Sequence, residues 1–431
     1  MTNRTALTLV FMLSFLSYMT PELSTSLQLA PLGLFAALVL FNVLWSDSIF
    51  NAVWSLFKWD GLVFVILVSL LMIAPSLASD SAKSTETALM VSACLILARL
   101  YMAIVPVEEV LEAFFWSGIV SIGLFTFFTF TSLVQSIETL ERFSPFSFHP
   151  NLLAFLSAGY FCVMAWKFRT GDWRMKILTG LFGSLCLIIA FFASSRGSLI
   201  GILVGCLFVS GMAILGAGEN QRGKFLRWGL LAATLLVATV LVAQDRGWTA
   251  EAYDFIDQAL ALSAADRGFD SGFTGRIDKW NATTNLLSDG TWIVGKGIRS
   301  SDSMPDDLID NSYLVLTYEL GLVPMILITW RFLRILQRFM KSYFSSIEKK
   351  QRLLCLACSL LVVTFLVNNV VARYLFGVGN PYSLLAFFFF AAPTEHLVQS
   401  SVLSTDKRSQ PQLVVGRPTS NFQRSSPQHN G

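Results

Sequence analysis

The sequence predicts an all-α integral membrane protein, a helical bundle of about twelve transmembrane helices with one long polar loop. The chain of 431 residues is 54% hydrophobic and only 14% charged, and its mean hydropathy is +0.61. In soluble domains about a quarter of the residues are charged. The apolar stretches are long and do not alternate with polar residues, which favours helices over the strands of a β-barrel.

The apolar stretches divide into twelve candidate spans, each about as long as a bilayer core requires. The first follows Arg4, and because no small-residue cleavage site comes after it, we expect an uncleaved helix that ends near Met19. The others cover residues 27–45, 59–78, 86–106, 110–134, 150–168, 175–195, 197–217, 227–244, 312–330, 353–372 and 380–396.

These spans predict one transmembrane domain over residues 1–396. Residues 397–431 are rich in Ser, Gln, Pro and Arg and poor in apolar residues. Such a composition cannot bury a core, so we expect a disordered tail.

Charged residues in the loops predict how the chain is oriented. Basic residues gather in the loops at 167–176, 219–227 and 331–352, which lie on one side if twelve spans are counted. The loop between residues 245 and 310 instead carries twelve acidic and six basic residues. Because basic loops stay in the cytoplasm, we expect both termini there and the long loop, residues 245–311, outside.

Two arginines on the predicted outer side have the chemistry of phosphate ligands. Arg196 stands in a tight hairpin between two apolar stretches, and Arg276 begins a predicted loop helix. A guanidinium group can donate two parallel hydrogen bonds to a phosphate, and a helix start offers free N–H groups. The alternatives are an interfacial anchor for Arg196 and a surface ion pair for Arg276. Lys296 and Arg299, in the turn GKGIRS, are further candidates for binding phosphate.

Candidates for proton transfer lie where the loop re-enters the membrane. Asp310 and Asn311 could simply cap the next helix, in which Tyr313 follows. A carboxylate at this place could instead accept a proton from a sugar hydroxyl, and His149 precedes another span on the same side. Glu319 lies about two turns into an apolar stretch, which makes it a functional candidate or the partner of a buried base. Three other charged residues raise the same question: Arg99, Glu112 and Arg373.

Several classes of site are not indicated. No group of His, Cys and acidic residues has the spacing of metal ligands, and no phosphate-binding loop, dinucleotide fingerprint or nucleophile elbow occurs. We therefore expect no metal, no cofactor, no nucleic acid and no nucleotide-sugar donor. A transporter of a lipid-linked solute stays open as an alternative, although transporters usually have repeated halves and polar residues at mid-membrane, which we do not find.

Three motifs, in this order, resemble those of the bacterial O-antigen ligases and the related O-antigen and exopolysaccharide polymerases. The motifs are SSRGSLIGILVG (194–205), TGRIDKW with GKG (274–297) and DNSYLVLTYELGL (310–322), so the core that carries them is 194–322. Twelve spans with a long outer loop before the tenth are also similar to this family's layout. The resemblance implies an enzyme of the bacterial inner membrane that moves a glycan from undecaprenyl diphosphate to an acceptor hydroxyl on the outer face, without a metal.

The resemblance also implies roles for individual residues. Arg196 and Arg276 would hold the diphosphate of the lipid, with Lys296 and Arg299 as further ligands. The family's ligases carry a His at the position that matches Asp310, so this sequence departs from the ligase pattern. That departure favours a polymerase over a ligase that joins the glycan to lipid A core. The implied proton acceptor is Asp310 with His149 in reserve, supported by Asn311, Tyr313 and Glu319, and the implied partners are the bilayer, an acceptor glycan and other polysaccharide assembly proteins.

Overall fold

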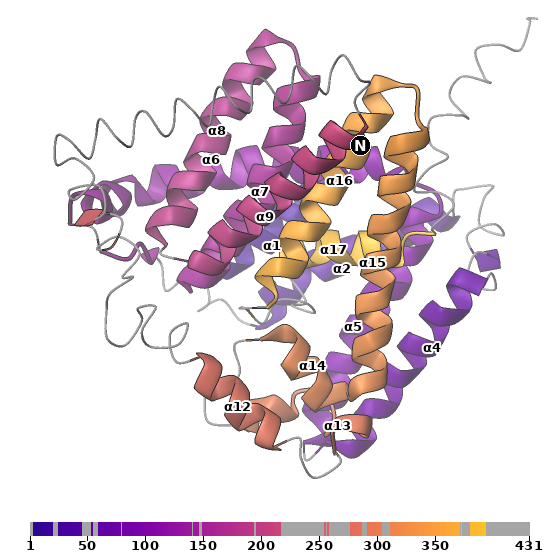
Figure 1. Cartoon of the computed structure of the whole chain (residues 1–431). Helices are drawn as coiled ribbons and strands as arrows, with labels where there is room; N and C mark the ends of the chain where they lie inside the picture. Colours follow the sequence, from indigo (N-terminus) through magenta and orange to yellow (C-terminus); the bar gives the residue numbers. More distant parts are fainter. Residues whose placement is uncertain are drawn as a thin grey trace, which may run out of the picture.

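The regular elements in the described part of the chain are all helices (Figure 1). The computed structural model describes residues 3–19, 25–44, 53–54, 59–78, 80–139, 141–145, 149–193, 195–216, 254–255, 257, 276–286, 291–303, 311–370, 372 and 380–393. The elements are α1 (Asn3–Met19), α2 (Thr25–Leu44), α4 (Trp59–Ile73), η1 (Ala74–Leu77), α5 (Ser81–Met102), α6 (Val107–Thr139), α7 (Pro150–Thr170), α8 (Trp173–Phe192), α9 (Arg196–Leu215), α12 (Arg276–Leu286), α13 (Thr291–Val294), η3 (Ser300–Ser303), α14 (Ser312–Leu320), α15 (Leu322–Ser345), α16 (Lys349–Asn368) and α17 (Pro381–Ala391). The predicted all-α class is confirmed for these residues.

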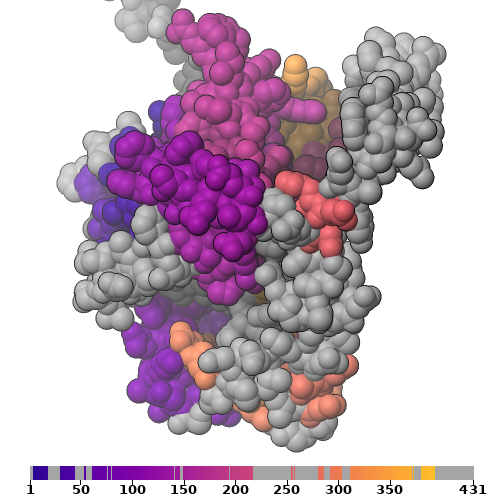
Figure 2. Space-filling model, turned by 90° about the vertical axis from the view of Figure 1, so that its left-hand side faces the viewer, coloured from indigo at the N-terminus to yellow at the C-terminus, as the bar shows by residue number. Residues whose placement is uncertain are grey.

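Six of the described helices are long and apolar enough to cross a membrane, namely α5, α6, α7, α8, α9 and α16. Their outer surfaces have the apolar character that lipid requires. In α6, whose purple residues stand on the face drawn in Figure 2, Phe127 is 77% exposed and Phe128 is 62% exposed. The protein is therefore a helical membrane protein. The number of twelve spans stays a prediction, because the predicted span 227–244 and the predicted tail 397–431 lie outside the described residues.

The predicted span at 312–330 is not one continuous helix, because the structure divides it into two helices. Helix α14 ends at Leu320, and Gly321 takes a left-handed φ of 88° before α15 begins. The break is tightly packed, since a Cβ atom at Gly321 would lie 2.3 Å from the carbonyl oxygen of Ile293. Only glycine fits both this φ and this close approach.

The predicted basic loop at 331–352 is also wrong for most of its length. Helix α15 continues to Ser345, and α16 begins at Lys349. The basic residues of α15 lie mainly on its exposed side, as Arg334 and Lys341 do, while Ile335 and Phe339 of the same helix are buried. An amphipathic helix therefore occupies this stretch.

The centre of the bundle is the short helix α17, and every one of its residues is buried. It packs mainly against α5, α1, α7 and α15 (Figure 1). Aromatic rings join α17, α7 and α6. The ring of Tyr382 of α17 lies 4.7 Å from that of Phe155 of α7 between centroids, and the ring of Tyr160 of α7 stacks on that of Phe114 of α6 at 4.6 Å. A Cβ atom at Gly159 would approach the Tyr382 ring to 2.7 Å, so α7 and α17 are in close contact.

Two buried arginines hold the carboxyl end of α17. Arg331 of α15 donates from Nε to the carbonyl oxygen of Phe390 at 2.9 Å and from Nη2 to that of Ala392 at 2.8 Å. Arg99 of α5 donates from Nη1 to the carbonyl oxygen of Ala391 at 2.9 Å. A helix end leaves carbonyl groups unpaired and carries partial negative charge, so two cations there satisfy both needs.

The other charged residues from apolar stretches are explained in part. Glu112, near the start of α6, forms a short ion pair with Lys167 at the end of α7, and Arg4 of α1 lies 3.8 Å from the same carboxylate. Arg373 lies outside the described residues.

We predict that Arg331→Met lowers the stability of the bundle markedly. Two hydrogen bonds from a charged donor would be lost and two buried carbonyl groups left unpaired, at a cost of about 3 kcal/mol. Because Cys94, Cys162, Cys186, Cys355 and Cys358 are buried, unfolding in detergent can be followed as the temperature at which a thiol-reactive dye labels them.

Arg334→Met is the matched control, since Arg334 is on the same helix, is exposed and bonds only to the Gln337 side chain in the described part. Equal labelling temperatures for the two variants would show that the arginine contacts with α17 contribute little.

Candidate functional site

The candidate residues lie toward one end of the bundle, which we call the loop end. Here α7 and α9 begin and α8 and α16 end, and the helices α12, α13 and α14 gather next to it (Figure 1). At the opposite end, which we call the basic end, α6 and α16 begin and α7 ends. The ion pairs Lys167–Glu112 and Lys350–Glu108 join these three helices at the basic end.

Arg196 is the first residue of α9, and the glycines that follow it fix the place of this helix. A Cβ atom at Gly201 would lie 2.7 Å from the Asn368 side chain, and one at Gly205 would lie 2.5 Å from Thr364 Oγ1. Gly197, Gly201 and Gly205 recur every four residues, a spacing that lets two helices in a membrane approach closely. The motif SSRGSLIGILVG therefore packs α9 against α16 and sets Arg196 at the loop end.

The motif that begins at residue 310 attaches to the same helix, α16. The backbone N–H of Ser312 donates to the carbonyl oxygens of Asn369 and Ala372 at 3.0 Å each. Ser312 Oγ donates to Asn369 Oδ1 and to the carbonyl oxygen of Ala372, at 2.7 Å each. The start of α14 is thus anchored at the end of α16, within about one turn of the point where Gly201 meets Asn368.

Asn311 and Tyr313 have structural roles at this junction. Asn311 Oδ1 accepts hydrogen bonds from the backbone N–H groups of Tyr313 at 2.9 Å and Leu314 at 3.2 Å, which makes Asn311 the N-cap of α14. The hydroxyl of Tyr313 donates to the carbonyl oxygen of Leu366 at 3.0 Å. The capping interpretation of Asn311 is confirmed, whereas Asp310 lies outside the described residues.

Arg142 joins two helix ends that are close in the chain to His149 and Arg196. Arg142 donates from Nη2 to Asn151 Oδ1 at 2.9 Å and from Nε to the carbonyl oxygen of Ala193 at 3.1 Å. It therefore joins the start of α7 to the end of α8, three residues before Arg196. His149 occupies the N-cap position of α7, where it is exposed and its side chain makes no capping bond.

Lys296 lies at the far end of α14. The backbone N–H of Lys296 donates to the carbonyl oxygen of Tyr318 at 2.8 Å. The backbone N–H of Gly297 donates to the carbonyl oxygen of Glu319 at 2.9 Å. The Nζ atom of Lys296 lies 5.2 Å from the centroid of the Tyr318 ring. The Glu319 carboxylate is buried and accepts a short hydrogen bond from Ser301 Oγ. Glu319 thus binds the GKGIRS turn and the residue after it to α14, through its backbone and its side chain.

Arg299 belongs to an ion-pair cluster at the start of α5. Arg299 has a left-handed φ of 68°, and both its Nε and its Nη2 atoms lie 2.7 Å from Asp302 Oδ2. Lys83 of α5 lies 2.9 Å from the same oxygen, and the three side chains line a hollow of about 200 Å³. Partial burial would raise the pKa of Asp302, but Lys83 and Arg299 outweigh it, so this pKa lies below its usual value. The cluster is therefore intact at neutral pH and weakens as acid protonates Asp302.

The structure thus divides the candidate residues into two groups joined by α14. Arg196, Asn311 and Tyr313 lie at the ends of α9 and α16, and Lys296, Arg299 and Glu319 lie at the other end of α14. Seven residues separate Ser312 from Glu319, which is roughly 10 Å along a helix. Arg276 is the first residue of α12, which contacts α14, and its side chain is outside the description.

Three residues of this region were not singled out by the sequence. Arg142, Lys83 and Asn369 each stand alone in the sequence, without a motif around them. Their importance comes from contacts with helices that are distant in the chain. Among the described residues, no three His, Cys, Asp or Glu side chains are placed to hold a metal ion.

Chemically, the loop end offers guanidinium groups beside buried, neutral helix caps. Such a surface can bind an anionic group such as a phosphate. Comparisons with known proteins add no identification: no family model matches the chain, and no curated protein or solved structure is significantly similar to it.

Proposed function

We propose that this protein is a membrane glycosyltransferase that moves a glycan from undecaprenyl diphosphate to a sugar hydroxyl and so extends an exopolysaccharide or O-antigen chain. The observation that carries the proposal is the meeting of two motifs at the end of α16. Gly201 brings the start of α9, with Arg196, against Asn368, and Ser312 binds Asn369 with the start of α14. Motifs over a hundred residues apart thus converge on one helix end.

The arginines account for the first half of the proposed reaction. When the bond between the sugar C1 and the phosphate oxygen breaks, the diphosphate gains negative charge. Arg196, at a fixed place on α9, and Arg276, at the start of α12, would stabilise this charge without rearrangement. One such donor contributes roughly 3–4 kcal/mol to lowering the barrier. Arg299 pairs with Asp302. We assign the leaving group to Arg196 and Arg276 first, because the resemblance of their motifs implies this role.

A base completes the proposed reaction. The acceptor hydroxyl forms the new bond to C1, and its proton passes to a carboxylate or an imidazole. Asp310 precedes the cap residue Asn311 and is our first candidate. His149 is our second, because it is exposed at the loop end and Arg142 ties the start of its helix to the end of α8. In this proposal the loop end faces the outside of the inner membrane and the basic end faces the cytoplasm.

The activity itself can be tested with purified protein in lipid nanodiscs that contain an undecaprenyl-diphosphate glycan. We expect longer lipid-linked glycans and release of undecaprenyl diphosphate, resolved by gel electrophoresis and mass spectrometry. Transfer to added lipid A core in place of elongation would identify a ligase. Movement of the intact lipid-linked glycan across a vesicle membrane, without any new glycosidic bond, would contradict both and identify a transporter.

We predict that Arg196→Lys and Arg276→Lys each reduce transfer by about a hundredfold or more, while the protein still inserts into the membrane. Lysine keeps the charge but loses the paired hydrogen bonds of the guanidinium group. The measurement is the initial rate of diphosphate release. Arg169→Lys, at the exposed end of α7 on the basic end, is the matched control and should keep the normal rate. Normal rates in both test variants would contradict the proposed diphosphate site and would mean that the two arginines only anchor the chain at the membrane interface.

We predict that Asp310→Asn abolishes transfer without unfolding the protein. Asparagine keeps the shape of aspartate but cannot accept the proton, and the cap of α14, Asn311, is unchanged. Asp310→His should restore part of the activity, and its rate should rise with pH through about 6.5, where a free His loses its proton. The pH–rate profile of each variant is the measurement. An active Asp310→Asn variant beside an inactive His149→Ala variant would assign the base to His149.

A further inference from the structure

A largely apolar cavity lies between residues 161–169 of α7 and residues 179–187 of α8, and we call it the α7–α8 groove. Its volume is about 370 Å³, in the range of pockets that bind ligands. Phe168 and Ser184 line it and are exposed, so the groove opens at the surface of the bundle. Both helices are long and apolar enough to cross a membrane. The groove therefore opens toward lipid.

Two glycines of α8 line the groove, and close packing of the helices does not require them. A Cβ atom at Gly180 would lie 3.7 Å from the ring of Phe168, and one at Gly183 would lie 3.6 Å from Met164. These are ordinary contact distances, unlike the closer approaches between α9 and α16. The glycines thus leave room for an apolar chain beside α8.

The basic end of the groove carries two cations. Arg169 lines the groove from the last turn of α7, and it is the one charged side chain among the described lining residues. Lys176 precedes Gly180 by four residues, which places it on the same face of α8. Both side chains are exposed, and neither forms a hydrogen bond or an ion pair with a described residue.

The depth of these residues matches that of lipid head groups. Trp173, the first residue of α8, is 66% exposed, and exposed tryptophan at a helix end is typical of a membrane interface. From this end the groove extends along α7 to Phe161 and along α8 to Leu187. Each stretch rises about 12 Å along its helix, and half of a bilayer core is about 15 Å thick. The groove thus has the length of an acyl chain within one leaflet.

The turn between α7 and α8 has a surplus of positive charge. Between residues 169 and 176 stand three basic residues, Arg169, Arg174 and Lys176, and one acidic residue, Asp172, which leaves two positive charges. Asp172 accepts the capping hydrogen bond of the Met175 N–H at 2.9 Å and forms no ion pair with a described residue.

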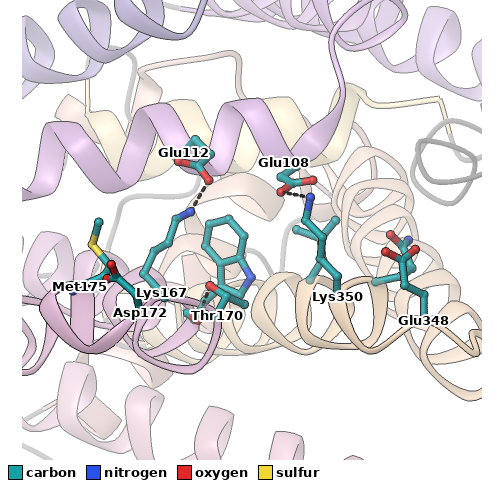
Figure 3. A pocket seen from close by; sticks show the side chains of 12 residues that line it. Glu108, Glu112, Lys167, Thr170, Asp172, Met175, Glu348 and Lys350 are labelled. Atoms are coloured by element: carbon teal, nitrogen blue, oxygen red, sulfur yellow. Dashed lines mark hydrogen bonds and ion pairs between the residues drawn. The ribbon is translucent and has the colours of Figure 1, made fainter. Parts of the chain in front are cut away.

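The carboxylates of α6 do not cancel this charge, because other cations bind them. Lys167 pairs with Glu112, and Lys350 lies 2.9 Å from Glu108. Figure 3 shows both lysines directed across a neighbouring cavity toward α6. Helix residues two positions apart do not face each other, so Arg169 lies on a different side of α7 from Lys167.

We propose that the α7–α8 groove binds one anionic phospholipid of the leaflet at the basic end. Arg169 and Lys176 bind its phosphate, and one acyl chain lies in the groove along Gly180 and Gly183. Basic pockets between transmembrane helices favour anionic head groups, whereas a zwitterionic head group adds an ammonium group to a region that is already positive. The site lies at the end of the bundle opposite Arg196 and is independent of the proposed transfer.

The test places the full chain in phosphatidylcholine nanodiscs with a small share of a phosphatidylglycerol that carries a photoreactive diazirine on one acyl chain. After illumination, mass spectrometry of peptides locates the label. We expect labelling concentrated at residues 161–168 and 180–187, and unlabelled phosphatidylglycerol should displace it while added phosphatidylcholine does not. Equal labelling of the exposed residues Phe127 and Phe128 of α6 would mean contact with bulk lipid only and would overturn the proposal.

Variants separate the two parts of the site. Arg169→Gln with Lys176→Gln should lower labelling of the groove about fivefold or more. Arg334→Gln with Lys341→Gln removes two exposed cations of α15 and is the matched control, which should keep normal labelling. Gly180→Leu fills the groove and keeps both cations, and labelling there should fall to the level of α6. The temperature at which a dye labels the buried cysteines checks that each variant is folded.

Two further results would contradict the proposal. Unchanged labelling in the variant without Arg169 and Lys176 would mean that these cations do not bind the lipid, whatever Gly180→Leu does. Glycerol phosphate is a water-soluble phosphate ester without acyl chains, and we expect it not to compete. Competition by glycerol phosphate would assign the two cations to a free phosphate compound in place of a lipid.

Discussion

A helix that ends inside a bundle leaves carbonyl groups that neither lipid nor water can satisfy, and this constraint shapes the centre of the protein. Helix α17 is entirely buried, and Arg99 and Arg331 donate to three consecutive carbonyl oxygens at its end. The arginines come from α5 and α15, so the same hydrogen bonds fix the distance between those two helices. The aromatic contacts of α17 with α7 then tie the remaining helices to this centre.

A second close contact, between α9 and α16, fixes the arrangement of helices at the loop end. Gly201 and Gly205 allow α9 to approach α16 so closely that any side chain in their place would collide with Asn368 or Thr364. The end of α16 in turn binds Ser312 through its backbone and side chain. The position of Arg196 relative to α14 is thus set by packing between helices rather than by the long loop.

The sequence was sufficient to predict the class of the protein, because long apolar stretches have few other structures available in a membrane. Hydropathy could not reveal the break at Gly321, since the stretch LVLTYELGLVPMILITW is apolar on both sides of it. The sequence analysis also assigned the second half of α15 to a loop. Charged residues on the exposed face of this helix lower the mean hydropathy of the stretch, and a polar loop would lower it in the same way. Asn311 was recognisable as a cap from its place before an apolar stretch. Arg99 donates to a backbone carbonyl group 292 residues away, and Arg142 donates to one 51 residues away; no residue pattern in the sequence marks such partners.

Helix ends leave unpaired backbone groups at both ends of the bundle, and different kinds of side chain bind or join them at the two ends. At the loop end, the amide side chains of Asn311 and Asn369 and the guanidinium group of Arg142 form hydrogen bonds at the helix ends, and no carboxylate takes part in these bonds. At the basic end, carboxylates cap and join the helices, as Asp172 and Glu112 do. Carboxylates compete with phosphate for arginine and repel it, whereas amides do neither. The two ends of the bundle therefore differ in the charge of the side chains that hold their helix ends, and this difference holds whichever way the chain is oriented in the membrane.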